Sequence, residues 1–312
     1  MGILYANEGN IDIWIDTDKR FISVEDNGTG ITAEEFEITL QSIAQSSKQL
    51  DIEKGFRGIG RLCGLAYCRE LIFSTTAKNE NIVSTMRIDV EKLRSRFYGD
   101  KKYTAQEVLD DVITVEKKIL DEIVADHWFK VEMIDINDEN EVLLDVATIR
   151  DYLSFVSPVE YRNTFFLSQK IYEHAATLNF KIDEYRINLN GVQLVKKYKT
   201  DFKTSQGEDE IFDLSFKDFY SDDGHLIAWS WIGLSKFKGV IEQNSKTPNN
   251  KMRSIRLRKG NIQIGDEDTL QKLFGEERGI HYFIGEVFVA DRNLIPNSQR
   301  DYFIENSALK IF

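Results

Sequence analysis

The sequence predicts a two-domain α+β protein, and the observations behind this prediction are its length, its composition and its mixture of strand and helix patterns. The 312 residues suffice for two domains of ordinary size. Hydrophobic residues make up 42% and charged residues 29% of the chain, and only three residues are proline, which is typical of a folded protein. Strand and helix patterns occur on both sides of Asp145, so we expect domains at residues 1–145 and 146–312.

The first predicted element is a β-hairpin that ends at an acidic residue. Ile11, Ile13 and Ile15 alternate with polar or aromatic residues, and an apolar run over 21–24 follows the polar turn Thr-Asp-Lys-Arg. Alternation on both sides of a polar turn is typical of two paired strands. The hairpin therefore places Asp26 at the end of its second strand.

Helices and further strands are expected in the rest of the first domain. The segment Thr-Ala-Glu-Glu beginning at Thr32 is a capping box, which predicts a helix with Phe36, Leu40 and Ile43 on one face. The later expected elements are a helix over 58–69, strands over 70–76 and 83–90, a helix from Thr104 through Ile119 with a capping box completed by Glu107, and a strand over 130–136.

The second domain is expected to begin with a helix over 149–156, which Pro158 ends. The pair Asn190-Gly191 predicts a hairpin over 186–194, because both residue types accept the positive φ of a two-residue turn. The remaining expected elements are a helical or mixed segment over 165–178, strands over 225–234 and 281–290, and exposed loops over 207–210 and 243–250.

Two glycine-rich motifs lie in one short N-terminal segment. Residues 24–31 read Val-Glu-Asp-Asn-Gly-Thr-Gly-Ile, and residues 55–60 read Gly-Phe-Arg-Gly-Ile-Gly. The first motif supplies the carboxylate of Asp26 on a loop whose glycines let the backbone approach a flat base. The second offers backbone N–H groups at the start of a helix, where they can hold phosphate oxygens. Together the motifs indicate a nucleotide pocket.

The two motifs resemble the D-x-G-x-G and G-x-x-G-x-G boxes of the GHKL ATPases, which include gyrase, the ninety-kilodalton heat-shock chaperone, histidine kinases and MutL. The resemblance implies a Bergerat-type α/β sandwich that binds ATP, with Asp26 on the adenine amino group, Gly30 beside the base, and the N–H groups of Gly58 and Gly60 around the phosphates. The nucleotide-binding residues that the resemblance implies are Asp26, Asn27, Gly28, Gly30, Lys48, Gly55, Arg57, Gly58, Ile59 and Gly60. The alternative is a glycine-rich hairpin turn followed by a glycine-rich helix start.

A mobile lid is expected between the two boxes, over residues 46–56. The segment Ser46-Ser47-Lys48 is similar to the Thr-Ser-Lys of MutL lids. The whole segment is polar and ends close to glycine, so its local opening should cost little free energy.

The chain departs from the superfamily at two places, in the catalytic helix and at the adenine site. In these ATPases a helix before the first strand carries a Glu that activates water and an Asn that binds magnesium. No Glu-x-x-x-Asn pattern precedes the strand near Ile11, and Glu8 and Asn10 fall in the expected loop. We therefore expect either a truncated form of a longer protein or a loss of hydrolysis, with ATP and Mg²⁺ as cofactors of a full-length form and no metal-binding residue identified here. In several relatives a Gly-Thr pair at the start of the closing strand touches the adenine site, whereas the corresponding stretch here is His127-Trp128-Phe129, so this box is not matched and His127 is interpreted as structural.

The C-terminal part is similar to the middle domain of the heat-shock-90 chaperone family. The similarity is carried by residues 255–264, 283–289 and 293–300, the last of which form a Leu-Pro-Leu-Asn-x-Ser-Arg-like loop. It implies a βαβ-type middle or transducer domain, and it gives Arg300 a catalytic role at the γ-phosphate of ATP. Alternatively, Arg300 pairs with Asp301 or with another surface carboxylate.

Basic residues recur along the first strand of that similar region. Arg256, Arg258 and Lys259 predict a solvated strand face or, alternatively, a basic face for an acidic partner.

Three function classes remain open. The first is a heat-shock-90-like ATPase that couples its nucleotide state to domain movement on a protein client. The second is a nucleotide-binding or protein-interaction module without hydrolysis, and the third is a MutL-like DNA-associated clamp. The formal net charge of −12 argues against nucleic acid as the partner. A full-length form as a homodimer also stays open.

Composition favours a cytoplasmic protein. Cys63 and Cys68 are too few for a disulfide framework and lack the spacing of a metal site, so we expect them to pack in the core. No apolar run approaches the ~20 residues that cross a bilayer, and the N-terminus has no signal pattern.

Overall fold

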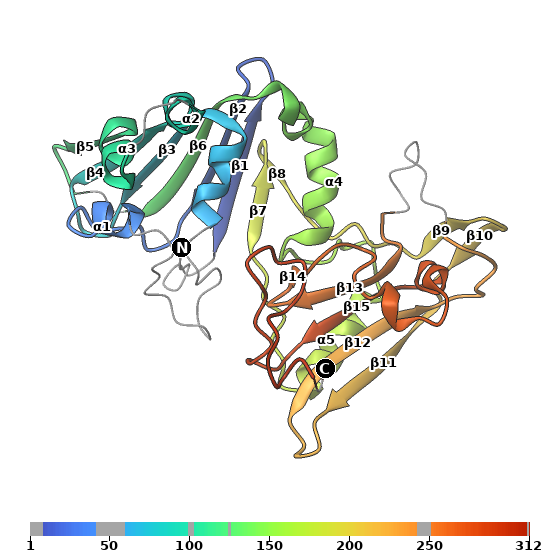
Figure 1. Ribbon diagram of the computed structural model, residues 1–312. Coiled ribbons are helices and arrows are strands. Elements are labelled where there is room, and N and C mark those ends of the chain that lie inside the picture. Colours follow the sequence, from blue (N-terminus) through green and yellow to red (C-terminus); the bar gives the residue numbers. More distant parts are fainter. Residues whose placement is uncertain (1–8, 42–59, 99–102, 124–125, 242–250, 311) are drawn as a thin grey trace. The chain divides into compact units, whose positions relative to one another are not determined.

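The computed structural model describes residues 9–41, 60–98, 103–123, 126–241, 251–310 and 312. The chain forms two compact units. Unit 1 contains Met1–Arg150 and Tyr185–Leu194, and unit 2 contains Asp151–Glu184 and Val195–Phe312. The chain therefore passes between the units three times, whereas the sequence suggested one boundary after Asp145 (Figure 1).

Unit 1 is built on an eight-stranded mixed sheet in the order β5-β4-β3-β6-β2-β1-β7-β8. Neighbouring strands are antiparallel except β1 and β7, which are parallel. This mixed sheet with short helices confirms the predicted α+β class. The strands are β1 (Asn10–Asp16), β2 (Phe21–Asp26), β3 (Cys68–Thr76), β4 (Ile82–Asp89), β5 (Ile113–Ile119), β6 (Trp128–Ile136), β7 (Arg186–Leu189) and β8 (Val192–Gln193).

The predicted N-terminal hairpin is confirmed. In β1 and β2, Ile13 pairs with Val24 and Ile15 with Ile22, and the last two side chains are buried. The alternation of the isoleucines therefore sets which face of the sheet turns inward. Asp26 is the last residue of β2, as expected.

Helices pack on the strands at one side of this sheet. Helix α2 contacts β3, helix α3 contacts β4 and β5, and the two helices contact each other (Figure 1). The capping box at Thr104 is confirmed, because Thr104 Oγ1 accepts from the Glu107 amide at 3.3 Å and the Thr104 amide donates to Glu107 Oε2 at 2.8 Å. The helical segments that begin in unit 1 are α1 (Phe36–Gln41), η1 (Gly60–Ala66), α2 (Val90–Tyr98), α3 (Ala105–Val112), η2 (Asp138–Leu144) and α4 (Val146–Val156).

The long helix expected through Ile119 is wrong in its second half. Helix α3 ends at Val112, and the next residues form the edge strand β5. Ile113 already has extended dihedral angles, with φ −103° and ψ 131°. The β-branched residues of the Ile-Thr-Val segment fit a strand paired with β4 better than a helix, so tertiary pairing overrides the helical spacing of the apolar residues.

Of the helix expected over 58–69, residues 60–66 form the short 3₁₀ segment η1 and residues 68–69 already belong to β3, while residues 58–59 lie outside the described residues. Gly64 lies in this segment, and a Cβ built on it would lie 2.7 Å from Leu71 Cδ1, so a larger residue there would have to displace the buried side chain of Leu71. Cys68 is buried in β3, and burial raises the pKa of its thiol to about 11. Cys63 is exposed, which corrects the expectation that both cysteines pack in the core.

The hairpin at Asn190-Gly191 is confirmed, but it belongs to the sheet of unit 1. Asn190 and Gly191 have φ values of 49° and 75°, as a type I′ turn requires. The side chain of Asn190 accepts from the Ile15 amide at 2.8 Å and donates to the Ile15 carbonyl at 2.9 Å. These two bonds fix the end of β7 beside β1.

Unit 2 contains a five-stranded sheet in the order β11-β12-β15-β13-β14 and a two-stranded sheet of β9 and β10. Strands β13 and β15 are parallel, and the chain between them carries the 3₁₀ segments η4 and η5. The arrangement therefore resembles the predicted βαβ type, but the connection between the two parallel strands carries 3₁₀ segments in place of an α-helix. The elements are α5 (Ser168–Thr177), β9 (Asp201–Thr204), β10 (Gly207–Glu210), β11 (Asp213–Tyr220), β12 (Leu226–Leu234), β13 (Ser254–Lys259), β14 (Ile262–Gln263), η4 (Gln271–Leu273), η5 (Glu277–Tyr282) and β15 (Ile284–Val289).

Two expectations for unit 2 need correction. Residues 207–210, expected as an exposed loop, form β10, because they pair with β9 across a tight turn. The strand expected over 281–290 begins only at Ile284, since His281 still belongs to the 3₁₀ segment η5, which ends at Tyr282. Residues 243–250, also expected as a loop, lie outside the described residues.

The larger sheet of unit 2 has an apolar cluster on each face. In β12, Trp229 and Trp231 join one cluster and Ala228 joins the other. Trp229 stacks on Phe288 of β15 with ring centroids 4.6 Å apart. Because both faces are covered, β12 is a buried central strand, which explains its nearly continuous apolar sequence.

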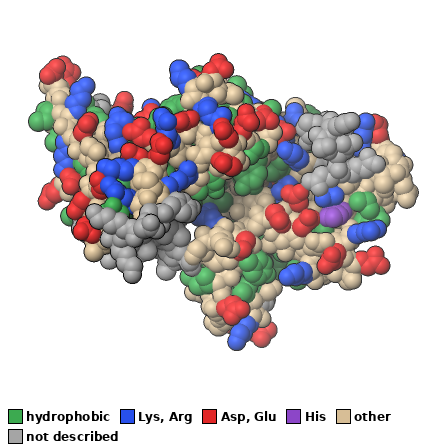
Figure 2. Space-filling model, turned by 45° about the horizontal axis from the view of Figure 1, so that its top comes forward, with side chains coloured by type: hydrophobic (Ala, Val, Ile, Leu, Met, Phe, Trp, Pro, Cys, Tyr) green, Lys and Arg blue, Asp and Glu red, His purple; other side chains and the backbone are tan. Residues whose placement is uncertain are grey.

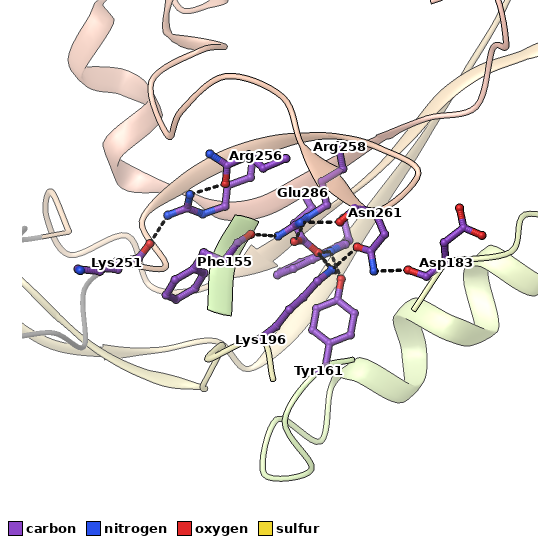
Figure 3. A network of polar contacts seen from close by, with 11 residues as sticks. Phe155, Tyr161, Asp183, Lys196, Lys251, Arg256, Arg258, Asn261 and Glu286 are labelled. Carbon is purple, nitrogen blue, oxygen red and sulfur yellow. Dashed lines mark hydrogen bonds and ion pairs between the residues drawn. The ribbon is translucent and has the colours of Figure 1, made fainter. Parts of the chain in front are cut away.

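A buried polar network lies inside the first of these clusters (Figure 3). The carboxylate of Glu286 in β15 accepts from Trp231 Nε1 at 3.1 Å and Lys196 Nζ at 3.3 Å, and also from Tyr161 Oη and Arg258 Nε. Glu286, Lys196 and Arg258 have no exposed surface. The predicted solvated or partner-binding strand face is therefore wrong for Arg258.

Arg256 is buried as well. Its Nη1 donates to Gln263 Oε1 at 2.7 Å, its Nη2 donates to the Lys251 carbonyl, and its guanidinium lies 4.8 Å from the ring centroid of Phe155. The strand β13 is covered on both faces, and each buried arginine has acceptors inside the unit. Lys259, at the end of the strand, donates to the carbonyl of Asp291.

The charges in the network shift one another's pKa values. Burial alone would raise the pKa of Glu286, but the nearby Arg258 and Lys196 lower it to about 2. Burial, together with the positive charge of Arg258, lowers the pKa of Lys196 to about 7, although Glu286 and Glu184 oppose this shift. One buried carboxylate thus faces two basic groups, and the lysine is the group that loses its proton first.

This lysine makes the stability of unit 2 depend on pH. Between the folded pKa of about 7 and the ordinary lysine pKa of 10.5, the unfolded chain binds a proton that the folded unit does not, so the free energy of unfolding rises with pH. We expect Lys196→Met to remove this rise. Chemical denaturation at about pH 7 and about pH 9, followed by the fluorescence of buried tryptophans, measures the effect.

The matched control is Lys203→Met, which changes an exposed lysine of β9 in the same unit. It should retain the wild-type pH dependence. An equal rise of stability in Lys196→Met and in the wild type would contradict the role given to Lys196.

Candidate functional site

The candidate site is the acidic glycine turn at the end of β2, in unit 1. Strand β2 lies between β1 and β6, so the turn leaves the middle of the sheet. The Gly28 amide donates to Asp26 Oδ1 at 2.9 Å, which is an Asx turn. A carboxylate has about four lone-pair sites, so this bond leaves capacity for a further donor.

Asn27 ties the turn to the start of β1. The Asn10 amide donates to Asn27 Oδ1 at 2.8 Å, and the Asn27 amide donates to the Asn10 carbonyl at 3.2 Å. The side chain of Asn10 contacts Asp12 and Asn188, with distances of 2.6 and 3.2 Å. Asn10 is thus engaged within the sheet.

Gly30 brings the turn into close contact with the end of β3. Its φ is +69°, and a Cβ built on it would lie 2.1 Å from the carbonyl oxygen of Thr76. The next amide, of Ile31, donates to Thr75 Oγ1 at 3.0 Å, and that hydroxyl donates to the Trp128 carbonyl at 2.7 Å. Only glycine fits this position, for both conformational and steric reasons.

His127 holds the turn from the β6 side. Its Nδ1 is hydrogen-bonded to the Gly28 carbonyl oxygen. Because a carbonyl oxygen only accepts, this ring nitrogen must carry the proton. His127 therefore positions the backbone of the turn.

Sequence reasoning missed two further contributors. Thr75 bridges the turn to β6, as described above, and the Glu80 carboxylate accepts from the Ala33 amide at 3.1 Å. The only sequence signal was the Thr-Thr pair that ends β3. Neither residue lies near the turn in sequence, so the pairing of β3 with β6 had to be known first.

The structure brings together Asp26, Asn27, Gly28 and Gly30, the residues of the first box. The second box is described only from Gly60, the first residue of η1. The predicted lid over 46–56 lies outside the described residues, and so do the remaining implied phosphate-site residues, Lys48, Gly55, Arg57, Gly58 and Ile59.

Arg300 lies in unit 2 and lines a cavity of about 690 Å³. Its backbone has a left-handed φ of 56°, and its carbonyl accepts from the Gly265 amide at 2.7 Å. Burial lowers the pKa of its guanidinium. The cavity is also lined by the acidic residues Asp266, Asp268, Glu277 and Asp301 and by Lys272.

Acidic residues that line this cavity form hydrogen bonds with residues other than Arg300. Asp301 accepts from Asn297 Nδ2, and Asp268 accepts from His281 Nε2 at 2.9 Å. Within the described ranges, the Arg300 guanidinium has no ion pair. The alternative that Arg300 pairs with Asp301 is therefore not seen there.

The turn of unit 1 presents the carboxylate of Asp26 on a backbone that is held from several sides. A carboxylate accepts hydrogen bonds from donors such as an exocyclic amine, and Gly30 allows the backbone of the turn to pack against the end of β3. Among the residues that the structure describes, no group of three or more His, Cys, Asp or Glu side chains could hold a metal ion. The described helices also include none long and apolar enough to cross a membrane.

Comparison with known proteins agrees with this chemistry. Residues 4–118 match the family model described as histidine kinase-, DNA gyrase B-, and HSP90-like ATPase. The matched stretch contains both glycine boxes and the strands from β1 through most of β5. No curated protein matches the chain. Over these residues, which are fewer than half of the chain, the sequence is similar to that family.

Proposed function

We propose that unit 1 binds ATP and that the nucleotide state is coupled to movement of unit 2 on a protein client. The observation that carries this proposal is the first glycine box, which is held by Asn10, Thr75 and His127. A turn fixed from several sides is preorganised for a ligand, because little ordering entropy remains to be lost on binding.

Asp26 is the proposed adenine-recognising group. Its carboxylate accepts from the exocyclic amine of adenine, and the glycines on either side of Thr29 allow the base to lie against the backbone. The residues of the second box, including Gly60 at the start of η1, then surround the phosphates with N–H groups. Magnesium would neutralise phosphate charge in this site when ATP is bound.

Arg300 is the proposed phosphate-binding arginine of unit 2, in keeping with the heat-shock-90-like resemblance. A partly buried guanidinium that forms no ion pair among the described residues keeps donors available for an anionic ligand, and this supports the proposal. A guanidinium suits a phosphoryl group because it stays charged and offers a fork of donors.

The second candidate function is a nucleotide-binding module without hydrolysis. The engagement of Asn10 with Asp12 and Asn188 favours it, because this amide is then occupied within the sheet and does not serve a magnesium ion. The DNA-associated clamp gains no support from the surface. Acidic and basic side chains are interspersed on the visible described surface in Figure 2, and the net charge is −12.

Adenine recognition should depend on Asp26. A charge-assisted hydrogen bond contributes roughly 1.5–3 kcal/mol, so Asp26→Asn should weaken ATP binding about tenfold or more. Isothermal titration calorimetry with ATP measures this loss. The conservative change keeps the shape of the side chain, and unchanged affinity would remove Asp26 from the site.

The close approach of Gly30 to β3 should also be necessary for binding. Gly30→Ala places a methyl group 2.1 Å from the Thr76 carbonyl oxygen, so the turn has to move away from the strand. We expect ATP affinity to fall at least about tenfold. The control is Gly191→Ala, a glycine with similar φ, +75°, and no atom within 4 Å of the added Cβ.

Both glycine variants carry the same type of backbone strain, so the difference between them isolates the effect of the close contact. Circular dichroism verifies that the variants fold. Equal ATP affinity in the two variants would show that the approach to β3 is not needed.

Arg300 should act on the rate rather than on binding. In a form of the protein that hydrolyses ATP, Arg300→Ala should lower kcat by about 10³-fold while ATP affinity stays nearly constant, because the arginine meets charge that develops in the transition state. The control is Arg278→Ala, an exposed arginine of η5. Joint loss of rate and binding would place Arg300 in ground-state contact or in the core of unit 2.

A further inference from the structure

The three chain connections between the units all lie next to the buried network of unit 2. They occur at residues 150–151, 184–185 and 194–195. Phe155 follows the first connection, Asp183 precedes the second, and Lys196 follows the third. Each of these three residues is hydrogen-bonded to a member of the network (Figure 3).

Arg258 holds the segment after the first connection. Its Nη2 donates to the Phe155 carbonyl at 2.6 Å, in the last turn of α4. A cation at this end of a helix also interacts favourably with the exposed carbonyl groups and with the helix dipole. The same guanidinium donates to the Asn261 carbonyl at 3.0 Å and to Glu286.

Asn261 joins the second and third connections. Its Nδ2 donates to the Asp183 carbonyl at 2.7 Å, and its Oδ1 accepts from Lys196 Nζ at 2.7 Å. The backbone of Lys196 is held as well, because its amide donates to the Glu160 carbonyl at 2.8 Å and its carbonyl accepts from the Arg162 amide at 3.2 Å. The side-chain amide of Asn261 is therefore a direct bridge between two connecting segments.

A second tie joins the first and third connections. Asp151, the first residue of unit 2, forms an ion pair with Lys197, and Lys251 Nζ lies 3.9 Å from the same carboxylate. This pair is only partly buried, so its contribution is smaller than that of the buried network.

The polarity of this core needs a reason. Burying charged groups costs solvation free energy, and well-packed apolar residues of similar volume often give equal or better stability. Lys196 lies 4.2 Å from the ring centroid of Tyr161 and 5.3 Å from that of Phe288, so its surroundings are mostly aromatic. What the charged and amide groups supply, and an apolar core does not, is directional bonding to chosen backbone atoms.

We propose that Lys196, Arg258, Asn261 and Glu286 form an anchor that holds the three connecting segments of unit 2 as one block, through which movement caused by the nucleotide in unit 1 is passed on. The coupling part of this proposal rests on the proposed function of ATP binding. The four residues are positioning residues, since they act through the segments that they hold.

Asn261→Gly is the sharpest test of the anchor. Asn261 has a left-handed φ of 58°, which glycine adopts without strain, and the change removes the amide that joins Asp183 to Lys196. The matched control is Asn179→Gly, which replaces an exposed asparagine at a φ of 51° after α5. Tryptophan fluorescence of both variants verifies that unit 2 folds.

Hydrogen exchange measured by mass spectrometry reads the anchor directly. In the wild type, peptides covering 151–156, 183–184 and 195–198 should open together. In Asn261→Gly, exchange at 183–184 should rise about tenfold or more relative to 151–156, while Asn179→Gly should resemble the wild type. Identical exchange patterns in Asn261→Gly and Asn179→Gly would overturn the anchor.

The same experiment with ATP separates the anchor from the proposed function. ATP should alter exchange in all three segments of the wild type together, and Asn261→Gly should lose the response at 183–184 with ATP affinity unchanged by calorimetry. Heat of ATP binding without any change in these segments would overturn the coupling and leave ATP binding intact. Absence of ATP binding by calorimetry would overturn the proposed function and the coupling, while the exchange pattern without ATP would still decide whether the segments form one block.

Discussion

The parallel pairing of β7 with β1 is the constraint on which the arrangement of the chain depends. Residues 10–13 pair with residues 186–189, although a long stretch of chain separates them. Antiparallel neighbours can be joined by a short turn, whereas parallel neighbours need a long connection. In this protein the connection includes part of unit 2, so the chain leaves unit 1, returns for the hairpin β7-β8, and leaves again. The need to fix three connecting segments follows from that single pairing.

Local sequence patterns predicted the elements that depend on local forces. The β1-β2 hairpin, the capping box at Thr104 and the turn at Asn190-Gly191 were found because alternation, side-chain capping and positive φ are properties of neighbouring residues. Strand β5 was mistaken for the continuation of a helix, since apolar spacing in a short segment fits both structures until the partner strand is known. The placement of the β7-β8 hairpin in the first sheet likewise depends on a distant partner.

The candidate site was likewise predictable only in those features that depend on residues close together in the sequence. The first box marked Asp26 and Gly30 because a carboxylate and a glycine with positive φ are local features. Two side chains hold this box. Thr75 belongs to strand β3, and His127 is the residue before strand β6. Their roles exist only after β2, β6 and β3 have paired, so no pattern within a short window could reveal them.

The arginines of unit 2 show why residue type alone does not reveal a role. Arg258 has a carboxylate and backbone carbonyl groups as acceptors and no exposed surface, so its charge is satisfied inside the fold. Arg300 is partly buried beside a cavity, yet among the described residues no carboxylate forms an ion pair with it. From the sequence, Arg258 was predicted on a solvated or partner-binding strand face, and Arg300 received its expected role only from the resemblance to the heat-shock-90 middle domain. Desolvation costs free energy for a buried guanidinium, and Arg258 offsets this cost with acceptors in its own unit, whereas Arg300 is only partly buried and keeps part of its surface exposed.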